Sequence, residues 1–212
     1  MTPLAKKFFL LIMLFSSCIV NAQRDTISVV ELIDQIQVSV DTNIYLKNLV
    51  ITNASDLSSN FDSGSEKIII NKNVRFDNVI LPAFTGDLSH IVFKGNVESI
   101  NSAISFDNVI FERNFIYQIE KNAFGNIERP FFFLGISNSS FFSVVEINIE
   151  SEILENFGFW DNEIKSEPVN IVKNGEIGFV WESNINFTFK NLKTVDFSDN
   201  RIKTTDLPFF FN

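Results

Sequence analysis

Seven asparagines along the chain share one pattern of apolar residues upstream, and this pattern restricts the folds that the chain can adopt. The residue five positions before each asparagine is apolar in every case, and the residue three positions before is apolar except at Gly135. The intervals between the asparagines are 23, 18, 24, 24, 22 and 16 residues. Repetition at such intervals indicates a solenoid, because one coil cannot bury its own apolar face and must stack on its neighbours. The seven residues are Asn73, Asn96, Asn114, Asn138, Asn162, Asn184 and Asn200.

A weaker apolar column lies eight positions before the asparagines, so the repeat reads L-x-x-L-x-L-x-x-N, with Phe, Ile and Val often in place of Leu. This resembles the leucine-rich repeat family, in its extracellular form but without cysteine caps. The resemblance implies an α/β-type curved solenoid with a parallel β-sheet on its concave face, in about seven or eight irregular coils over residues 46–208. The clearest copies are LSHIVFKGN (88–96), FDNVIFERN (106–114), LENFGFWDN (154–162) and LKTVDFSDN (192–200).

A right-handed parallel β-helix is the alternative fold, since it also produces Phe-x-x-Asn motifs and stacked asparagines. The two folds differ in the second half of each repeat, where strand-like alternation would indicate the β-helix. Ala123-Phe124 and the segment LPAFTGDL (81–88) favour the leucine-rich repeat there. In that register the pentapeptide FDNVI, found at 76–80 and again at 106–110, falls at two different phases. In either fold we expect the asparagine amide to bond to backbone groups where the chain turns.

The N-terminal residues 1–22 have the composition of a secretory signal peptide. Lys6 and Lys7 precede a short apolar run, and Val20-Asn21-Ala22 matches a signal-peptidase site with cleavage after Ala22. The run is too short to predict a membrane span. The sequence therefore predicts a secreted, extracellular protein. Residues 23–45 are expected to form an N-terminal cap containing one or two strands, and residues 209–212 an uncapped C-terminal end.

Residue types that carry enzyme chemistry are scarce. The single cysteine, Cys18, lies in the predicted signal peptide, the single histidine is His90, and the eight glycines are scattered. A zinc site needs several Cys or His ligands, and a phosphate loop needs clustered glycines. We therefore predict a protein that is not an enzyme and holds no metal or cofactor. The formal charge of −9 argues against nucleic acid as a partner.

The strand position four residues before each asparagine is expected to face outward, and it is mostly apolar. An exposed apolar stripe of several coils indicates a binding surface, although β-branched residues also favour strands for their own sake. The first functional hypothesis is a recognition module that binds a protein or glycoprotein through its concave face. The second is a structural or adhesive surface protein that self-associates, for example as a homodimer. The predicted binding residues are Val92, Ile110, Leu134, Trp160 and Val180.

Overall fold

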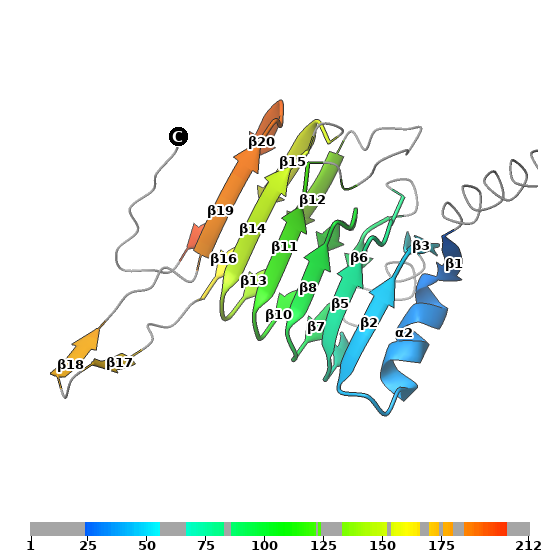
Figure 1. Cartoon of the computed structure of the whole chain (residues 1–212), viewed down its shortest axis with the longest axis horizontal. Coiled ribbons are helices and arrows are strands. Elements are labelled where there is room, and N and C mark those ends of the chain that lie inside the picture. Colours follow the sequence, from blue (N-terminus) through cyan, green and yellow to red (C-terminus); the bar gives the residue numbers. More distant parts are fainter. Residues whose placement is uncertain are drawn as a thin grey trace, which may run out of the picture.

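The structure is a computed structural model that describes residues 24–55, 67–82, 86–121, 123, 133–151, 154–165, 170–173, 176–179 and 185–202. Most of these residues lie in three parallel sheets (Figure 1). Sheet I contains β2 (Asn43–Lys47), β5 (Asn73–Asp77), β8 (Val97–Ile100), β11 (Phe115–Ile119), β14 (Val145–Glu150) and β19 (Ile185–Lys190). Sheet II contains β4 (Ile68–Ile70), β7 (Ile91–Phe93), β10 (Ile110–Phe111), β13 (Ser140–Phe141), β16 (Glu163–Ile164) and β21 (Arg201–Ile202). Sheet III contains β6 (Leu88–Ser89), β9 (Phe106–Asp107), β12 (Phe133–Ser137), β15 (Asn156–Trp160) and β20 (Thr194–Asp196).

Each coil passes through the sheets in the order I, III, II, so the fold is a parallel β-solenoid with three sides. The predicted solenoid of parallel strands is thus confirmed. The single concave sheet is not what the structure has, because the second half of a coil is also strand. Strand β11, for example, alternates between buried and half-buried residues along its whole length. Three sheets per coil is the arrangement of the alternative fold, a parallel β-helix.

Many of the corners that follow strands of sheets I and III turn at a residue with left-handed backbone conformation, and this accounts for part of the abundance of asparagine. Ten described non-glycine residues have positive φ: seven are Asn, two are Asp, and the remaining one is His90. These residue types tolerate the left-handed region better than other side chains do. Both copies of FDNVI contain such a residue. Asn78 has φ 56° after a strand of sheet I, and Asn108 has φ 53° after a strand of sheet III. The two copies therefore share one local structure at two different corners.

The asparagines used to set the repeat register belong to two corners rather than one. Asn96 and Asn114 lie between sheets II and I, and Asn73 begins the sheet I strand at the same corner, whereas Asn162 and Asn200 lie between sheets III and II. At the first corner, the Oδ1 of Asn73 accepts the backbone N–H of Asn96 at 2.8 Å, and the Oδ1 of Asn96 accepts that of Asn114 at 3.3 Å. Buried Asn162 accepts the N–H of Ser139 and donates to the carbonyl of Ile136 at the second. The predicted backbone-bonding role of asparagine is confirmed at these positions.

Asn138 was placed one residue out of register, and this reverses the faces predicted for its strand. The pairing of β12 with β15 sets Ser137 opposite Trp160, so Asn138 corresponds to Asp161 and Ser139 to Asn162. A one-residue shift moves every side chain of a strand to the other face of the sheet. Phe133, expected inside, is therefore 45 % exposed, and Leu134, expected outside, is 1 % exposed.

The uninterrupted coil is 18 residues long, which is six residues a side. Asn114 follows its ladder partner Asn96 by 18 residues, whereas Asn96 follows Asn73 by 23 and Asn73 follows Asn43 by 30. The interval of 18 residues, which is short for a leucine-rich repeat, is thus the plain coil. Longer coils carry extra residues between strands, as between β11 and β12, while the strands themselves stay in register.

Aromatic rings stacked from coil to coil fill the interior. Phe93, Phe111 and Phe141 occupy the same inward position of sheet II, with ring centroids 5.6 Å and 4.9 Å apart and planes within 10° of parallel. Stacking in register gives each ring two neighbours at van der Waals distance and excludes water. Tyr117 is fully buried beside Phe115 and Phe157, and its hydroxyl donates to the carbonyl of Ile104 at 3.0 Å. Burial raises the pKa of Tyr117.

The N-terminal cap includes a helix that the sequence analysis did not anticipate. Helix α2 (Val29–Val38) follows β1 (Asp25–Ser28), which pairs with β3 (Leu49–Thr52), and it lies beside β2 (Figure 1). Ser28 and Glu31 form a reciprocal capping box at its start. The helix buries Val29, Leu32, Ile33 and Ile36 against the core, the spacing of one helical face. Lys72 donates from Nζ to the carbonyl of Ile36 at 2.6 Å and so caps the C-terminal end of the helix.

Strands β17 (Asn170–Lys173) and β18 (Glu176–Phe179) do not pair with any of the three sheets. They pair with each other in antiparallel orientation.

Two buried serines give a test of the interior. Ser99 and Ser102 are both 0 % exposed, but the Ser99 hydroxyl has no hydrogen-bond partner, while Ser102 accepts the N–H of Val79 at 2.9 Å and donates to the carbonyl of Ile100. We expect Ser99→Ala to stabilise the protein by up to about 1 kcal/mol, because it removes an unsatisfied polar group. Ser102→Ala leaves the Val79 N–H unpaired and should cost about 1–3 kcal/mol. Urea unfolding of both variants measures the difference, and equal effects would contradict it.

Candidate functional site

The three outer faces of the solenoid differ in chemistry. Outward residues stack in rows along the axis because the strands pair in parallel register. On sheet II the row begins with Ile69, Val92 and Ile110, which are register partners on β4, β7 and β10. Ile69 is 48 % exposed, and the other two are half-buried. Beyond Ile110 the same row becomes polar, at Ser140, Glu163 and Arg201.

A depression adjoins this row at its centre. It has a volume of about 430 Å³ and is lined by Ile110, Glu112, Arg113 and Phe142. Phe142 is 43 % exposed, and the Lys165 ammonium lies 5.0 Å from its ring centroid. We call Ile69, Val92, Ile110 and Phe142 the sheet II patch. It combines an aliphatic row with an aromatic side chain and a charged rim.

Two large aromatic side chains gather on the outer face of sheet III. The Phe133 and Trp160 ring centroids lie 5.5 Å apart, with the planes tilted by 46°. Both rings lie over Gly135 and Gly158, which are register partners on β12 and β15. A Cβ added at Gly158 would fall 1.9 Å from Cζ3 of Trp160, and one added at Gly135 would fall 2.6 Å from Cη2. The glycines thus leave the space that the indole fills. We call the Phe133 and Trp160 rings the aromatic platform.

Carboxylate and hydroxyl groups flank the aromatic platform on the same face. Asp107 and Ser137 are register partners in the outward row that ends at Trp160. The Oδ1 of Asp107 accepts the Ser137 hydroxyl at 2.7 Å and the side-chain amide of Asn138 at 2.8 Å. Partial burial and the nearby Asp107 carboxylate raise the pKa of the Asp87 carboxyl. On the other side of the platform, Asp196 stands in register with Gly158.

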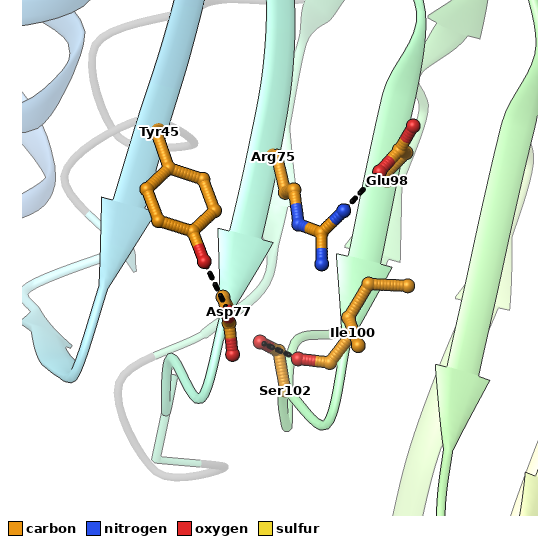
Figure 2. A network of polar contacts seen from close by, with 6 residues as sticks. All are labelled: Tyr45, Arg75, Asp77, Glu98, Ile100 and Ser102. Atoms are coloured by element: carbon orange, nitrogen blue, oxygen red, sulfur yellow. Dashed lines mark hydrogen bonds and ion pairs between the residues drawn. The ribbon is translucent and has the colours of Figure 1, made fainter.

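The outer face of sheet I carries paired charges, with the half-buried Ile100 and Ile116 among them. Figure 2 shows Tyr45 donating its hydroxyl to Asp77 and Arg75 bridging to Glu98 at 3.0 Å. The Arg75 guanidinium also lies 5.6 Å from the Tyr45 ring centroid. The hydrogen bond to Asp77 raises the pKa of Tyr45. Such exposed pairs add little stability, so this face is a solvated surface with its charges already satisfied locally.

The predicted binding residues do not form one stripe. Val92 and Ile110 lie side by side on sheet II, as the repeat predicted. Leu134 lies in the core, because the register of its strand is shifted, and it is not part of any surface. Trp160 belongs to a different face, sheet III. Val180 lies outside the described residues. The sequence analysis did not identify Phe133 or Phe142 as surface residues. For Phe133 a signal was present: in β12 it alternates with the inward Leu134 and Ile136, on the same side as Gly135.

The described part of the chain contains no group of three or more His, Cys, Asp or Glu side chains placed to hold a metal ion. His90 is the left-handed residue of a corner, with φ 58°, and it corresponds to Asn108 of the next coil in the register of sheet III. Among the described helices, none is long and apolar enough to cross a membrane. Comparisons of the chain with protein-family models, with curated proteins and with solved structures give no match.

The contact of the Trp160 indole with Gly158 can be tested by adding a side chain at the glycine. In a Trp181→Phe background Trp160 is the sole tryptophan, since the chain has two. Gly158→Ala should displace the indole, shift its emission to longer wavelength and cost about 1–3 kcal/mol of unfolding free energy. Most of that cost should vanish when Gly158→Ala is combined with Trp160→Ala. An unchanged emission maximum would show that the ring does not lie on the glycine.

Proposed function

We propose that this protein is an extracellular recognition module that binds a protein partner through the sheet II patch. The observation that carries the proposal is the row of Ile69, Val92 and Ile110 on the outer face of sheet II. Natural surfaces seldom expose aliphatic side chains in register over several strands unless another surface covers them. The same row is polar from Ser140 onward, so the apolar character is local rather than a general property of these strands.

The patch has the arrangement of a protein-binding surface. Ile110 and Phe142 line the depression, where an apolar side chain of a partner can be buried. Glu112 and Arg113 are exposed at its edge and supply the polar rim that surrounds such a centre. The backbone beneath it is held by hydrogen bonds from both neighbouring strands, so little order has to be gained on binding. These features support binding of a protein rather than a small molecule.

The extracellular location rests on the sequence. Residues 1–22 read as a signal peptide, and they lie outside the described residues. Three Asn-x-Ser/Thr sequons, at Asn53, Asn138 and Asn186, are exposed and thus accessible to glycosylation in a eukaryotic secretory pathway. A chain with no cysteine after residue 18 depends on packing and not on disulfides for its stability outside the cell.

Self-association is the second candidate function, and one observation favours it. The inward residues of β14 are fully buried, whereas the corresponding Ile185, Phe187 and Phe189 of β19 are only half-buried. In the described part of the chain β19 is an edge strand of sheet I. Edge strands that pair with a second copy give a homodimer or a longer adhesive array. Light scattering of the full chain over a concentration series separates this function from the first.

The sheet II patch predicts a sharp effect of charge. We expect Ile110→Lys and Val92→Lys to weaken binding to the purified partner by about tenfold or more, since a lysine cannot be buried unpaired at the centre of an interface. The partner is first isolated from the extracellular fluid of the producing cells by crosslinking to the full chain. The dissociation constants are then measured by calorimetry with the purified protein.

Ile116→Lys is the matched control, because Ile116 is also a half-buried outward aliphatic residue but lies on sheet I. It should leave binding unchanged, and all three variants should keep a cooperative unfolding transition. Equal loss of binding in the three variants would contradict the role of sheet II. Loss of a dimer in Ile110→Lys would assign the patch to self-association instead.

A further inference from the structure

We propose that the aromatic platform on sheet III is a binding site for a neutral glycan, with one sugar ring stacked on Trp160. This site lies on a different face from the sheet II patch and is independent of the proposed protein partner. The proposal rests on three observations: the seat of the indole, the chemistry of the groups around it, and the sign of their charge.

The contact of the Trp160 indole with two glycines holds the ring as a flat surface. Gly135 and Gly158 are paired across adjacent strands and present no side chain, so the six-membered ring of Trp160 rests against them. Phe133 packs beside it at 5.5 Å and fixes its position. Each ring loses little conformational freedom on binding, because it is already held in place. The axial C–H groups of a pyranose form a flat apolar face, which stacks on an aromatic ring held in this way.

The groups around the platform suit a ligand rich in hydroxyls. Asp107 uses Oδ1 for Ser137 and Asn138, and its Oδ2 has no partner among the described residues. Within the same part of the chain, the Trp160 indole N–H and the Asp87 carboxylate make no hydrogen bond either. These groups are two acceptors and a donor on one face. Sugar hydroxyls can satisfy both kinds at once, since each hydroxyl donates one hydrogen bond and accepts others.

The row geometry favours a chain of sugars over a single one. Ser89, Asp107, Ser137 and Trp160 follow one another on successive coils at the strand spacing of about 4.8 Å. An oligosaccharide laid along the solenoid axis therefore meets the platform with one ring and the Asp107 carboxylate with a neighbouring one. A protein anchor residue would instead need a pocket closed around it.

The charge of this face selects against acidic glycans. Asp87 and Asp107 lie on one side of the platform and Asp196 on the other. The nearby Lys67 ammonium donates both to the backbone carbonyl and to the side chain of Asn108, at 2.8 Å and 2.7 Å. Its charge interacts with the Asp107 carboxylate and offsets one of the three carboxylates, so the face keeps a net negative charge. A polyanionic chain would be repelled, whereas a neutral one would not.

The test uses the full chain carrying Trp181→Phe, in which fluorescence reports Trp160 alone. Cellohexaose, laminarihexaose, xylohexaose and chitohexaose are titrated against it, with polygalacturonate as the anionic comparison. We expect at least one neutral oligosaccharide to shift the emission saturably and polygalacturonate to leave it unchanged. Calorimetry with the same oligosaccharide should show binding weakened about tenfold or more by Trp160→Ala. Trp160→Phe should retain most of the affinity, because a ring remains to stack on, and Asp107→Asn should weaken binding severalfold.

Two controls keep the outcome decisive. Tyr45→Ala removes an exposed ring from sheet I and should not change glycan binding. Ile110→Lys should not change it either, so failure of the sheet II proposal and failure of this one are seen separately. The proposal is overturned if none of the four neutral oligosaccharides binds, if Trp160→Ala binds as well as the unaltered chain, or if polygalacturonate is preferred. A cooperative urea-unfolding transition of Trp160→Ala itself shows that its loss of binding is not a loss of folding.

Discussion

Closing a coil of 18 residues into three sides requires the backbone to turn sharply after only a few residues of strand. At many of the corners that follow sheets I and III, the chain does this by placing one residue in the left-handed conformation, and it uses Asn, Asp or His for that residue. A side chain at the corner has a second use, because its amide or carboxylate can bond to the neighbouring coil. Asn78 donates to the side chain of Asn48 at 2.7 Å in this way. The corners therefore both bend the chain and join the coils.

Everything inside and outside the solenoid follows from this stacking. Because each corner holds its coil in register with the next, inward residues meet their equivalents and aromatic rings stack along the axis. The same register lines up the outward residues, so one face carries paired charges, one an aliphatic row, and one an aromatic pair on glycines. Each face is built from several coils, and none of them is a property of a single strand.

The sequence predicted part of this structure well. Apolar columns at fixed offsets from asparagine predicted a solenoid of parallel strands, and the outward positions of Val92 and Ile110 followed from them. The number of sheets could not be obtained in the same way. Two short strands joined by a corner place their inward residues at L-x-x-L-x-L spacing. This spacing is the same whether the segment that follows them is a strand or not. In LSHIVFKGN the first apolar residue and the last two lie on different sheets, with His90 at the corner between them.

Register errors account for the site residues that were misplaced. Asn138 and Asp161 both precede a short polar residue and occupy the same corner position, but only the strand pairing shows that Ser139 stands where Asn162 does. This one-residue ambiguity put Leu134 outside and Phe133 inside. Helix α2, by contrast, was readable: Ser28 and Glu31 form a capping box ahead of apolar residues at helical spacing. The strands β1 and β2 on either side of this helix favoured the prediction of strands over the whole cap.

The variable length of the coils has a consequence for how such a chain can change. The strands of β8, β11 and β14 stay paired residue for residue although the spacing between neighbouring coils differs. Added residues therefore leave at a corner without disturbing the rungs on either side, at a cost that grows only slowly with their number. We therefore expect insertions at these corners to be tolerated, while a single-residue insertion within a strand would move its inward side chains to the outer face. The solenoid can thus lengthen its loops and keep its faces.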